Sequence, residues 1–455
     1  MVGTVVIGGG AAGIAAARRL QDAGEDVLLV EAGDRLGGRA YSVRLQSLFN
    51  ICGKPAHGPE SASRSAEEQE ARAAPLGTGR PDNMSGATKD VRPWEPTIDL
   101  GCGWLHSADR NPWTAIAERD GFVIDRSCPN WGVQWNDLHF PPDEKRASTA
   151  AYQRWHDAAL AALDGPDQPL SAFVAADDPW RPMIEAISGY ANGAPLDQVS
   201  LHDWAAYEDA ATDDNWALPA GYGTLILHHA VGVPIRLNTP VTRIDHSGHT
   251  LRIETLTGTI EADRIILAIP TTAYAAIAFD PPLPAKQDAA AALPLGLADK
   301  VFFAVDDPAW PANAHLVGNP HASCTASHRL SPFGLPIIES FFGGACAEAM
   351  PDANAATDFA KEELIGLLGS GWRDRLTPLA ATHWRTTPFI HGSYSHARIG
   401  HAGARAALAT PVDDRLFFAG EACSSTDFST AHGACRTGID AAEAILGLLP
   451  TAAAP

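Results

Sequence analysis

The range 4–39 constrains the fold of this chain more than any other stretch. Residues 4–7 (TVVI) predict a short, fully buried strand, because β-branched residues fill the run without alternation. An Ala-rich run then predicts a helix to about Ala23, and Val27 to Val30 predict a second buried strand. Between the first strand and the helix, three glycines stand in G-x-G-x-x-G spacing: Gly8, Gly10 and Gly13.

This order of elements is typical of a dinucleotide-binding βαβ unit. Gly8 allows the tight turn, Gly10 lets the backbone approach a pyrophosphate, and Gly13 lets the helix pack closely on the strand. The helix N-terminus offers unpaired N–H groups to the phosphates. Glu31 ends the second strand and is placed to bind a ribose diol.

The residues after Glu31 distinguish between two dinucleotides. The range 32–39 (AGDRLGGR) adds a second pair of glycines and a cation, Arg39, that can face the pyrophosphate. The run resembles the extension found in flavin adenine dinucleotide (FAD) proteins of the glutathione-reductase-like class. The sequence therefore favours FAD over NAD.

Composition excludes some partners and favours one setting. The chain has 455 residues, with 33 Lys plus Arg against 54 Asp plus Glu, a formal charge of −21. That balance argues against nucleic acid or an anionic membrane as partner. Seven scattered cysteines without a C-x-x-C pair favour a reduced, cytoplasmic setting and no metal site. No apolar run approaches the roughly 18 residues of a membrane span, so we expect a soluble protein.

The pattern along the chain predicts a mixed α/β protein with two interleaved domains. The expected FAD-binding domain is discontinuous, over 1–110, 215–290 and 385–455, and the substrate domain covers 111–214 and 291–384. A Pro-, Gly- and Ser-rich stretch from Gly53 to Pro96 predicts a flexible insertion, with one exposed helix over 65–74.

Several separated motifs then agree. They are GGGAAG (8–13), VEAGDRLGGRAYS (30–42), DLGCGWLHSADRNP (99–112), PAGYGTL (219–225), DKVFF (299–303), GSYS (392–395) and FFAGEACSSTDFSTAHGACRTG (417–438). Over nearly its whole length the chain resembles the FAD-dependent amine oxidases, which include monoamine oxidases, polyamine oxidases and lysine-specific histone demethylases. The closing motif is most similar to the polyamine oxidase and demethylase branch. The resemblance implies a glutathione-reductase-like Rossmann domain.

The resemblance also implies which residues hold FAD. Glu31 binds the adenosine ribose, Arg39 the pyrophosphate and the Val241 backbone the adenine. Ser393 stands where monoamine oxidases attach flavin through cysteine, so FAD is expected to bind non-covalently. The full expected set is Gly8, Gly10, Ala12, Gly13, Glu31, Ala32, Gly38, Arg39, Gly101, Cys102, Gly103, Trp104, Val241, Trp384, Gly420, Glu421 and Ala431.

Two residues are implied to be catalytic. In the family, the lysine at Lys300 holds a water against flavin N5, and such a lysine among apolar neighbours needs a partner. Tyr394 matches the aromatic wall beside the substrate amine. The expected substrate-binding residues are His106, Trp104, Tyr394 and Thr430, although Thr430 replaces the second aromatic ring of monoamine oxidases.

The leading interpretation is oxidation of a primary or secondary amine by hydride transfer to flavin N5, with O2 reduced to H2O2. An L-amino-acid oxidase is an alternative, and it requires an arginine in the pocket for the substrate carboxylate. A desaturase-like dehydrogenase and a non-catalytic, flavin-bound interaction module are further alternatives. The sequence leaves the amine, the electron acceptor and the oligomeric state open.

Overall fold

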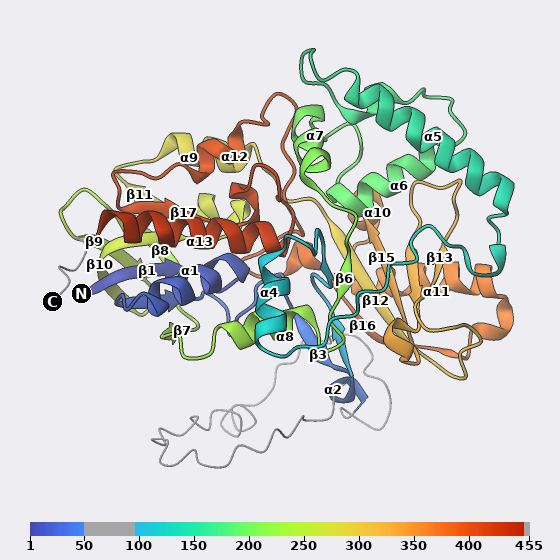
Figure 1. The fold of residues 1–455 in the computed structure, drawn as a ribbon, viewed down its shortest axis with the longest axis horizontal. Helices are drawn as coiled ribbons and strands as arrows, with labels where there is room; N and C mark the ends of the chain where they lie inside the picture. The colour runs from blue at the N-terminus through green and yellow to red at the C-terminus, as the bar shows by residue number, and fades with distance from the viewer. Residues whose placement is uncertain (50–95, 450–455) are drawn as a thin grey trace.

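The range 4–39 folds as the sequence predicts, into β1 Val2–Ile7, α1 Ala11–Asp22 and β2 Val27–Val30. β1 pairs in parallel with β2, so the helix crosses from one strand to the next over the sheet (Figure 1). All four residues of β2 are buried, as expected for a strand covered on both faces. This computed structural model describes residues 1–49 and 96–449.

β1 and β2 belong to an eight-stranded sheet, ordered β11-β8-β9-β10-β1-β2-β7, with β17 also paired to β10. Its remaining strands are β7 Ile235–Arg236, β8 Val241–Asp245, β9 Leu251–Thr255, β10 Gly258–Leu267, β11 Ala278–Asp280 and β17 Leu416–Phe418. β8, β9 and the first half of β10 form an antiparallel meander. The second half of β10 pairs in parallel with β1 and with β17, so this sheet unites distant parts of the chain.

Two long helices lie side by side over this sheet, α1 and the C-terminal α13 Ala431–Leu448 (Figure 1). Their backbones are close, because a Cβ atom on Gly438 would lie 2.2 Å from the carbonyl oxygen of Ala12. Alanines on both helices complete the contact and are buried in one hydrophobic cluster with β1. The two ends of the chain therefore build one layer of the fold.

The second sheet has five strands in the order β13-β14-β15-β12-β16. They are β12 Ala298–Val305, β13 Ala314–Val317, β14 Ser327–Leu330, β15 Ile337–Gly343 and β16 Leu376–Ala381. All neighbouring pairs are antiparallel. One face packs in a core with α11 Ala353–Leu368, which leaves the other face free to line a cavity.

The other helices and two small sheets connect and cover these layers. The helices are α2 Leu45–Phe49, α4 Pro112–Arg119, α5 Pro142–Leu160, α6 Arg181–Asn192, α7 Leu201–Ala210, α8 Tyr222–His229, α9 Pro284–Ala291, α10 Ala345–Ala349 and α12 Ala404–Ala409. The small sheets pair β3 Ser42–Arg44 with β4 Thr97–Asp99 and β5 Trp104–Leu105 with β6 Trp216–Ala217.

The predicted α/β class is therefore confirmed, and every strand of the eight-stranded sheet comes from 1–110, 215–290 or 385–455. The five-stranded sheet comes entirely from 291–384. The exact domain bounds stay a prediction. The insertion and the helix expected at 65–74 lie outside the described residues.

Two expectations are corrected. Residues 40–48 (AYSVRLQSL) are strand-like in sequence, but the strand stops at Arg44 and α2 follows, because Leu45-Gln-Ser-Leu has no β-branched residue to favour extension. The cysteines are not all reduced, since Cys324 and Cys346 form a disulfide. Their spacing along the sequence gave no sign of it, and the bond weakens the case for a reducing compartment.

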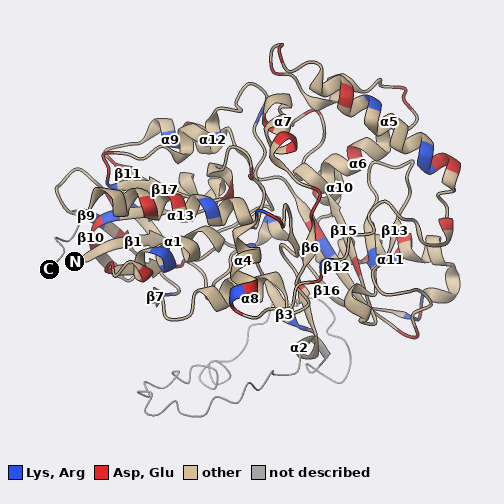
Figure 2. Cartoon of the chain, viewed as in Figure 1, with Lys and Arg blue, Asp and Glu red and all other residues tan. Residues whose placement is uncertain are grey.

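Acidic residues occur in both halves of the molecule, with Lys and Arg among them (Figure 2). The negative charge of the chain is therefore distributed over the fold and not confined to one element. Within the described ranges, no helix has both the length and the apolar character needed to cross a bilayer.

Candidate active site

A single cavity of about 1680 Å³ runs from the β1–α1 turn to the free face of the five-stranded sheet. Drug-sized ligands occupy roughly 300–1,000 Å³, so this volume suits a dinucleotide together with a substrate. All but one of the predicted cofactor and substrate residues line it. The exception is Gly13, whose added Cβ would lie 1.9 Å from the Gly8 carbonyl oxygen. Gly13 thus serves the helix–strand packing that the sequence assigned to it.

The dinucleotide end of the cavity is built by the start of α1. Gly10 caps this helix without a side-chain hydrogen bond, and a Cβ on Gly10 would meet no atom within 4 Å. The first turn of α1 carries no acidic residue. An uncapped helix N-terminus facing open space is a fitting site for a pyrophosphate.

Glu31 lies at the same end, where β2 stops. Its carboxylate accepts hydrogen bonds from the backbone N–H groups of Gly9, at 2.6 Å, and Gly33, at 2.7 Å. These two bonds fix the carboxylate beside the glycine turn and leave further lone pairs for a ribose diol. Val241, at the start of β8, lines the cavity near this end together with Thr239 and Pro240. Both placements fit the FAD contacts expected from the sequence, which stay a prediction.

We predict that Glu31→Ala weakens retention of FAD by on the order of tenfold or more, because one charge-assisted contact to the ribose is lost. The measurement is the ratio of flavin to protein absorbance after dialysis. Glu25→Ala, a partly exposed position on the same βαβ unit, is the matched control. Equal flavin retention in the Glu31→Ala variant and the parent would contradict the ribose assignment.

Arg39 and Glu421 join the two ends of the chain beneath the cavity. Arg39 Nη1 lies 2.8 Å from Glu421 Oε1 and donates to the Ser393 carbonyl oxygen at 2.6 Å. Burial alone raises the pKa of Glu421, but the charges of Arg39 and Arg405 outweigh it, so the pKa of this carboxyl is lowered. Glu421 is therefore ionised, and it holds Arg39 in place beside the glycine turn.

Lys300 lies on β12 with its side chain in the cavity, and it is 8% exposed. Its ammonium lies 2.7 Å from Glu339 Oε1 and donates to the Asp99 carbonyl oxygen at 3.0 Å. The partner that the sequence argument required is therefore Glu339, on the neighbouring strand β15. Burial raises the pKa of the Asp99 carboxyl to about 6, against the hydrogen bond from Ser42 and the charge of Lys300.

The segment 101–104 crosses the cavity next to Lys300. A Cβ on Gly101 would lie 1.8 Å from the Arg39 carbonyl oxygen, so this glycine is required by the neighbouring chain rather than by a ligand. A Cβ on Gly103 would lie 3.5 Å from Lys300 Nζ. Burial raises the pKa of Cys102 to about 12, so its thiol is neutral.

Trp384 and Tyr394 form aromatic parts of the cavity wall. The Trp384 backbone N–H is held by Asp299 Oδ1 at 3.0 Å. The Tyr394 hydroxyl donates to the Tyr190 carbonyl oxygen at 2.5 Å, and burial raises the pKa of Tyr394. Its hydroxyl is thus bound within the protein, which leaves the ring as the part that can face a substrate. Ser393 Oγ donates to the Ala298 carbonyl oxygen at 2.7 Å.

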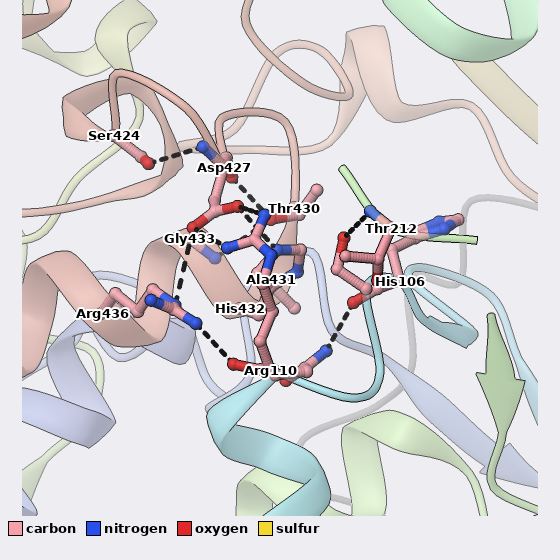
Figure 3. Close-up of polar contacts among 12 residues, drawn as sticks. His106, Arg110, Thr212, Ser424, Asp427, Thr430, Ala431, His432, Gly433 and Arg436 are labelled. Atoms are coloured by element: carbon pink, nitrogen blue, oxygen red, sulfur yellow. Dashed lines mark hydrogen bonds and ion pairs between the residues drawn. The ribbon is translucent and has the colours of Figure 1, made fainter. Parts of the chain in front are cut away.

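Thr430 and Ala431 lie at the N-terminus of α13, within a polar network around Asp427 (Figure 3). Thr430 Oγ1 donates to the Asp427 carbonyl oxygen at 2.6 Å and accepts from the Gly433 N–H at 3.0 Å. Its hydroxyl therefore caps the helix, which weakens the expected contact with substrate. Arg110 binds both oxygens of the Asp427 carboxylate, at 2.5 Å and 3.1 Å.

His106 lies near this network and lines the cavity (Figure 3). Its Nδ1 lies 2.6 Å from Asn215 Oδ1. Burial lowers the pKa of His106 to about 4, despite the hydrogen bond with Asn215. His106 is thus neutral at pH 7 and offers a substrate an uncharged hydrogen-bonding group.

We predict that the protein loses stability as the pH falls from about 6.5 to about 4. Burial lowers the pKa of His315 to about 3 and that of His396 to about 4. In that range an unfolded histidine takes up a proton that the folded one does not, so the free energy of unfolding falls. The raised pKa of Asp99 makes the free energy of unfolding rise as the pH falls, which opposes the effect of the histidines. The decisive measurement is therefore the difference in pH dependence between a variant and the parent. His315→Gln should flatten the dependence of the thermal midpoint on pH, and His249→Gln, at an exposed position, should not.

Sequence reasoning missed the residues of the five-stranded sheet that face the cavity. They are His315, Val317, Ser327, Arg329, Glu339 and Phe341. The signal was the alternation in SHRL and IIESFF. Ser327, Arg329, Glu339 and Phe341 line the cavity, and the alternating Leu330, Ile338 and Phe342 join the core. Two further buried thiols, Cys423 and Cys435, belong to hydrophobic clusters and do not line the cavity.

The chain matches two family models. Residues 6–66 match an NAD(P)-binding Rossmann-like domain, and residues 95–446 match the flavin containing amine oxidoreductases. The chain belongs to the flavin containing amine oxidoreductase family. FAD is its cofactor, and the uncapped start of α1, Glu31 and Arg39 fit that group.

Relatives agree with the predicted branch. The chain is 27% identical to polyamine oxidase 4 of Oryza sativa subsp. japonica, over 96% of this chain and 87% of that protein. It is 28% identical to lysine-specific histone demethylase 1 homolog 1 of the same organism, over 95% of this chain and 51% of that protein. Putrescine oxidase with bound putrescine has the same fold, with a TM-score of 0.71, 18% identity and coverage of 98% of this chain and 99% of that chain.

Proposed function

We propose that the protein oxidises a primary or secondary amine and that O2 is the electron acceptor. The amine carbon loses a hydride and the nitrogen a proton, which gives an imine. Water then converts the imine to an aldehyde or ketone, and O2 takes up the two electrons and two protons as H2O2. FAD, when bound, supplies the electron acceptance by receiving the hydride at N5.

One observation carries this proposal. Lys300, a buried ammonium, lies in the same cavity as the residues that fit FAD, between the segment 101–104 and the aromatic wall of Trp384 and Tyr394. Aromatic faces exclude water and favour a neutral amine over an ammonium ion. Positioning of the amine C–H in this closed space supplies the rate enhancement, and no strong protein base is needed.

The residues of this chain have distinct proposed tasks. The rings of Trp384 and Tyr394 orient the amine. Neutral His106 donates from Nδ1 to Asn215 Oδ1, so its Nε2 is left to accept a hydrogen bond from the amine. Lys300 orients a water beside the reacting atoms through a positive charge that Glu339 holds in place. Relatives whose names include polyamine and putrescine oxidation support an amine as the substrate.

The test measures oxygen consumption and peroxide formation by the flavin-containing protein with a panel of amines and amino acids. Peroxide formed in proportion to amine supports the proposal. If the protein oxidises an amine only when an artificial acceptor is supplied, and consumes no oxygen, then its electron acceptor is not O2. Bound flavin without turnover of any substrate favours the interaction module.

A further inference from the structure

The wall of the cavity formed by the five-stranded sheet carries three charged side chains on adjacent strands. Arg329 on β14, Glu339 on β15 and Lys300 on β12 all line the cavity. Arg329 lies directly opposite Glu339 in the antiparallel register. The three side chains on this wall are therefore two cations and one anion, and the carboxyls of Asp125 and Asp99 also act on Arg329 from outside the sheet.

Glu339 does not neutralise Arg329. Its carboxylate pairs with Lys300 at 2.7 Å, and no carboxylate oxygen of residues 1–49 or 96–449 lies within 4.0 Å of the Arg329 guanidinium. Arg329 instead donates from Nη2 to Asn313 Oδ1 at 2.7 Å. An arginine carries five N–H donors, so most of its hydrogen-bonding capacity is unused by these contacts.

Two aromatic rings fix the plane of this guanidinium. Its central carbon lies 4.7 Å from the centroid of the Trp104 ring and 4.5 Å from that of Phe333. Burial lowers the pKa of Arg329, against the charge of Glu339. A cation held in this way is desolvated and oriented before any ligand arrives, which are the conditions for bidentate binding of a carboxylate.

The same arrangement disfavours a second ammonium. A diamine that reached this wall would bring its distal cation towards Arg329, with the neighbouring carboxylate already committed to Lys300. Like charges in a desolvated site repel strongly. The wall therefore selects for a negative group at the end of the substrate that lies nearest Trp104.

We propose that Arg329 binds the carboxylate of the substrate, so that the amine oxidised by this protein is an amino acid rather than a simple amine or polyamine. This inference rests on the proposed amine oxidation, whose substrate class it specifies. Trp104 and Asn313 position the guanidinium, and Lys300 with Glu339 belongs to the oxidation itself.

The test compares substrates that differ only by a carboxylate. Suitable pairs are L-phenylalanine with 2-phenylethylamine, L-ornithine with putrescine, and 4-aminobutyrate with propylamine. In the parent protein, kcat/KM should be higher for the carboxylate member of at least one pair. In that pair, the kcat/KM of the carboxylate member divided by the kcat/KM of the simple amine should fall by on the order of 10²-fold in Arg329→Gln. Arg329→Lys, which keeps the charge but loses the planar fork, should lower the ratio by roughly tenfold.

A second measurement needs no turnover. Benzoate is titrated into the flavin-containing protein, and binding is followed by the change in flavin absorbance and in tryptophan fluorescence. Arg329→Gln should weaken benzoate binding by on the order of 10²-fold. Arg373→Gln is the matched control, because Arg373 is an exposed arginine that pairs with Glu362 on the outer side of the same domain.

The outcomes separate this inference from the proposed function. Efficient turnover of the simple amines, with no preference for a carboxylate and no effect of Arg329→Gln on the ratio, would overturn the carboxylate site and leave amine oxidation standing. Benzoate binding that depends on Arg329, without oxidation of any amine or amino acid, would retain the site and reject the proposed function. Equal benzoate affinity in the parent and Arg329→Gln would reject the site in either case.

Discussion

Lys300→Met is expected to slow the proposed O2-dependent half-reaction by on the order of 10²-fold while FAD stays bound, because a preorganised positive charge is removed from the place where we propose that oxygen acquires electrons. The measurement is the return of the flavin absorbance when an anaerobically reduced protein is mixed with oxygenated buffer. The same samples give the amount of bound flavin before reduction.

The design has to separate the lost ammonium from the carboxylate left behind. Removal of Lys300 leaves Glu339 nearly buried, at 14% side-chain exposure, without its partner. Lys300→Met combined with Glu339→Gln removes both charges, and it should be as slow as the single variant. Lys300→Arg keeps the charge and should be faster than both. Equal rates for the parent and Lys300→Met would reject the role assigned to this lysine.

Asp203→Ala is expected to lower the free energy of unfolding by about 3–5 kcal/mol, because it leaves a buried cation without its partner. Arg405 and Asp203 have side chains only 1% and 3% exposed, and they form two hydrogen bonds, Nε to Oδ1 at 2.6 Å and Nη2 to Oδ2 at 2.8 Å. Arg405 also lies 3.6 Å from the centroid of the Phe428 ring. Urea denaturation of the parent and the variant gives the difference in the free energy of unfolding.

A double replacement supplies the control for this prediction. Asp203→Leu with Arg405→Met removes both charges, so it should recover most of the stability lost by Asp203→Ala. It should nevertheless lose flavin more readily, because Arg405 donates to Ser395, whose hydroxyl in turn donates to Glu421 at 2.6 Å. If the double variant is as unstable as Asp203→Ala, the loss of stability comes from altered packing and not from the unpaired charge of Arg405.

The sequence predicted the fold well where a pattern has one physical reading. The uninterrupted apolar strands at 4–7 and 27–30, the glycine spacing and Glu31 fix a βαβ unit whatever the rest of the chain does. The helix over 353–368 was equally clear, because its periodicity spans several turns. Asn111 before Pro112 marked the start of α4, where its side chain accepts from the Trp113 N–H.

What the sequence could not predict depends on pairing between distant segments. Glu339 and Arg329 are ordinary charged residues in short strands until the sheet register places them opposite each other beside Lys300. Thr430 stands in the sequence where monoamine oxidases carry a second ring, and only its contacts with Asp427 and Gly433 show that it also caps α13. The Cys324–Cys346 disulfide likewise joins a loop to a helix, and the sequence around each cysteine gives no sign that the two segments are in contact.

The ion pair between Arg39 and Glu421 has a consequence for how the protein folds while it is being synthesised. The glycine turn and Arg39 are translated long before Glu421, which lies 382 residues further along the chain, between β17 and α13. Until β17 and α13 have been synthesised, the nascent chain therefore lacks one strand of the eight-stranded sheet, and its FAD site is incomplete. A polypeptide cut short before residue 416 is expected to emerge colourless, however well its first strands and helix have formed.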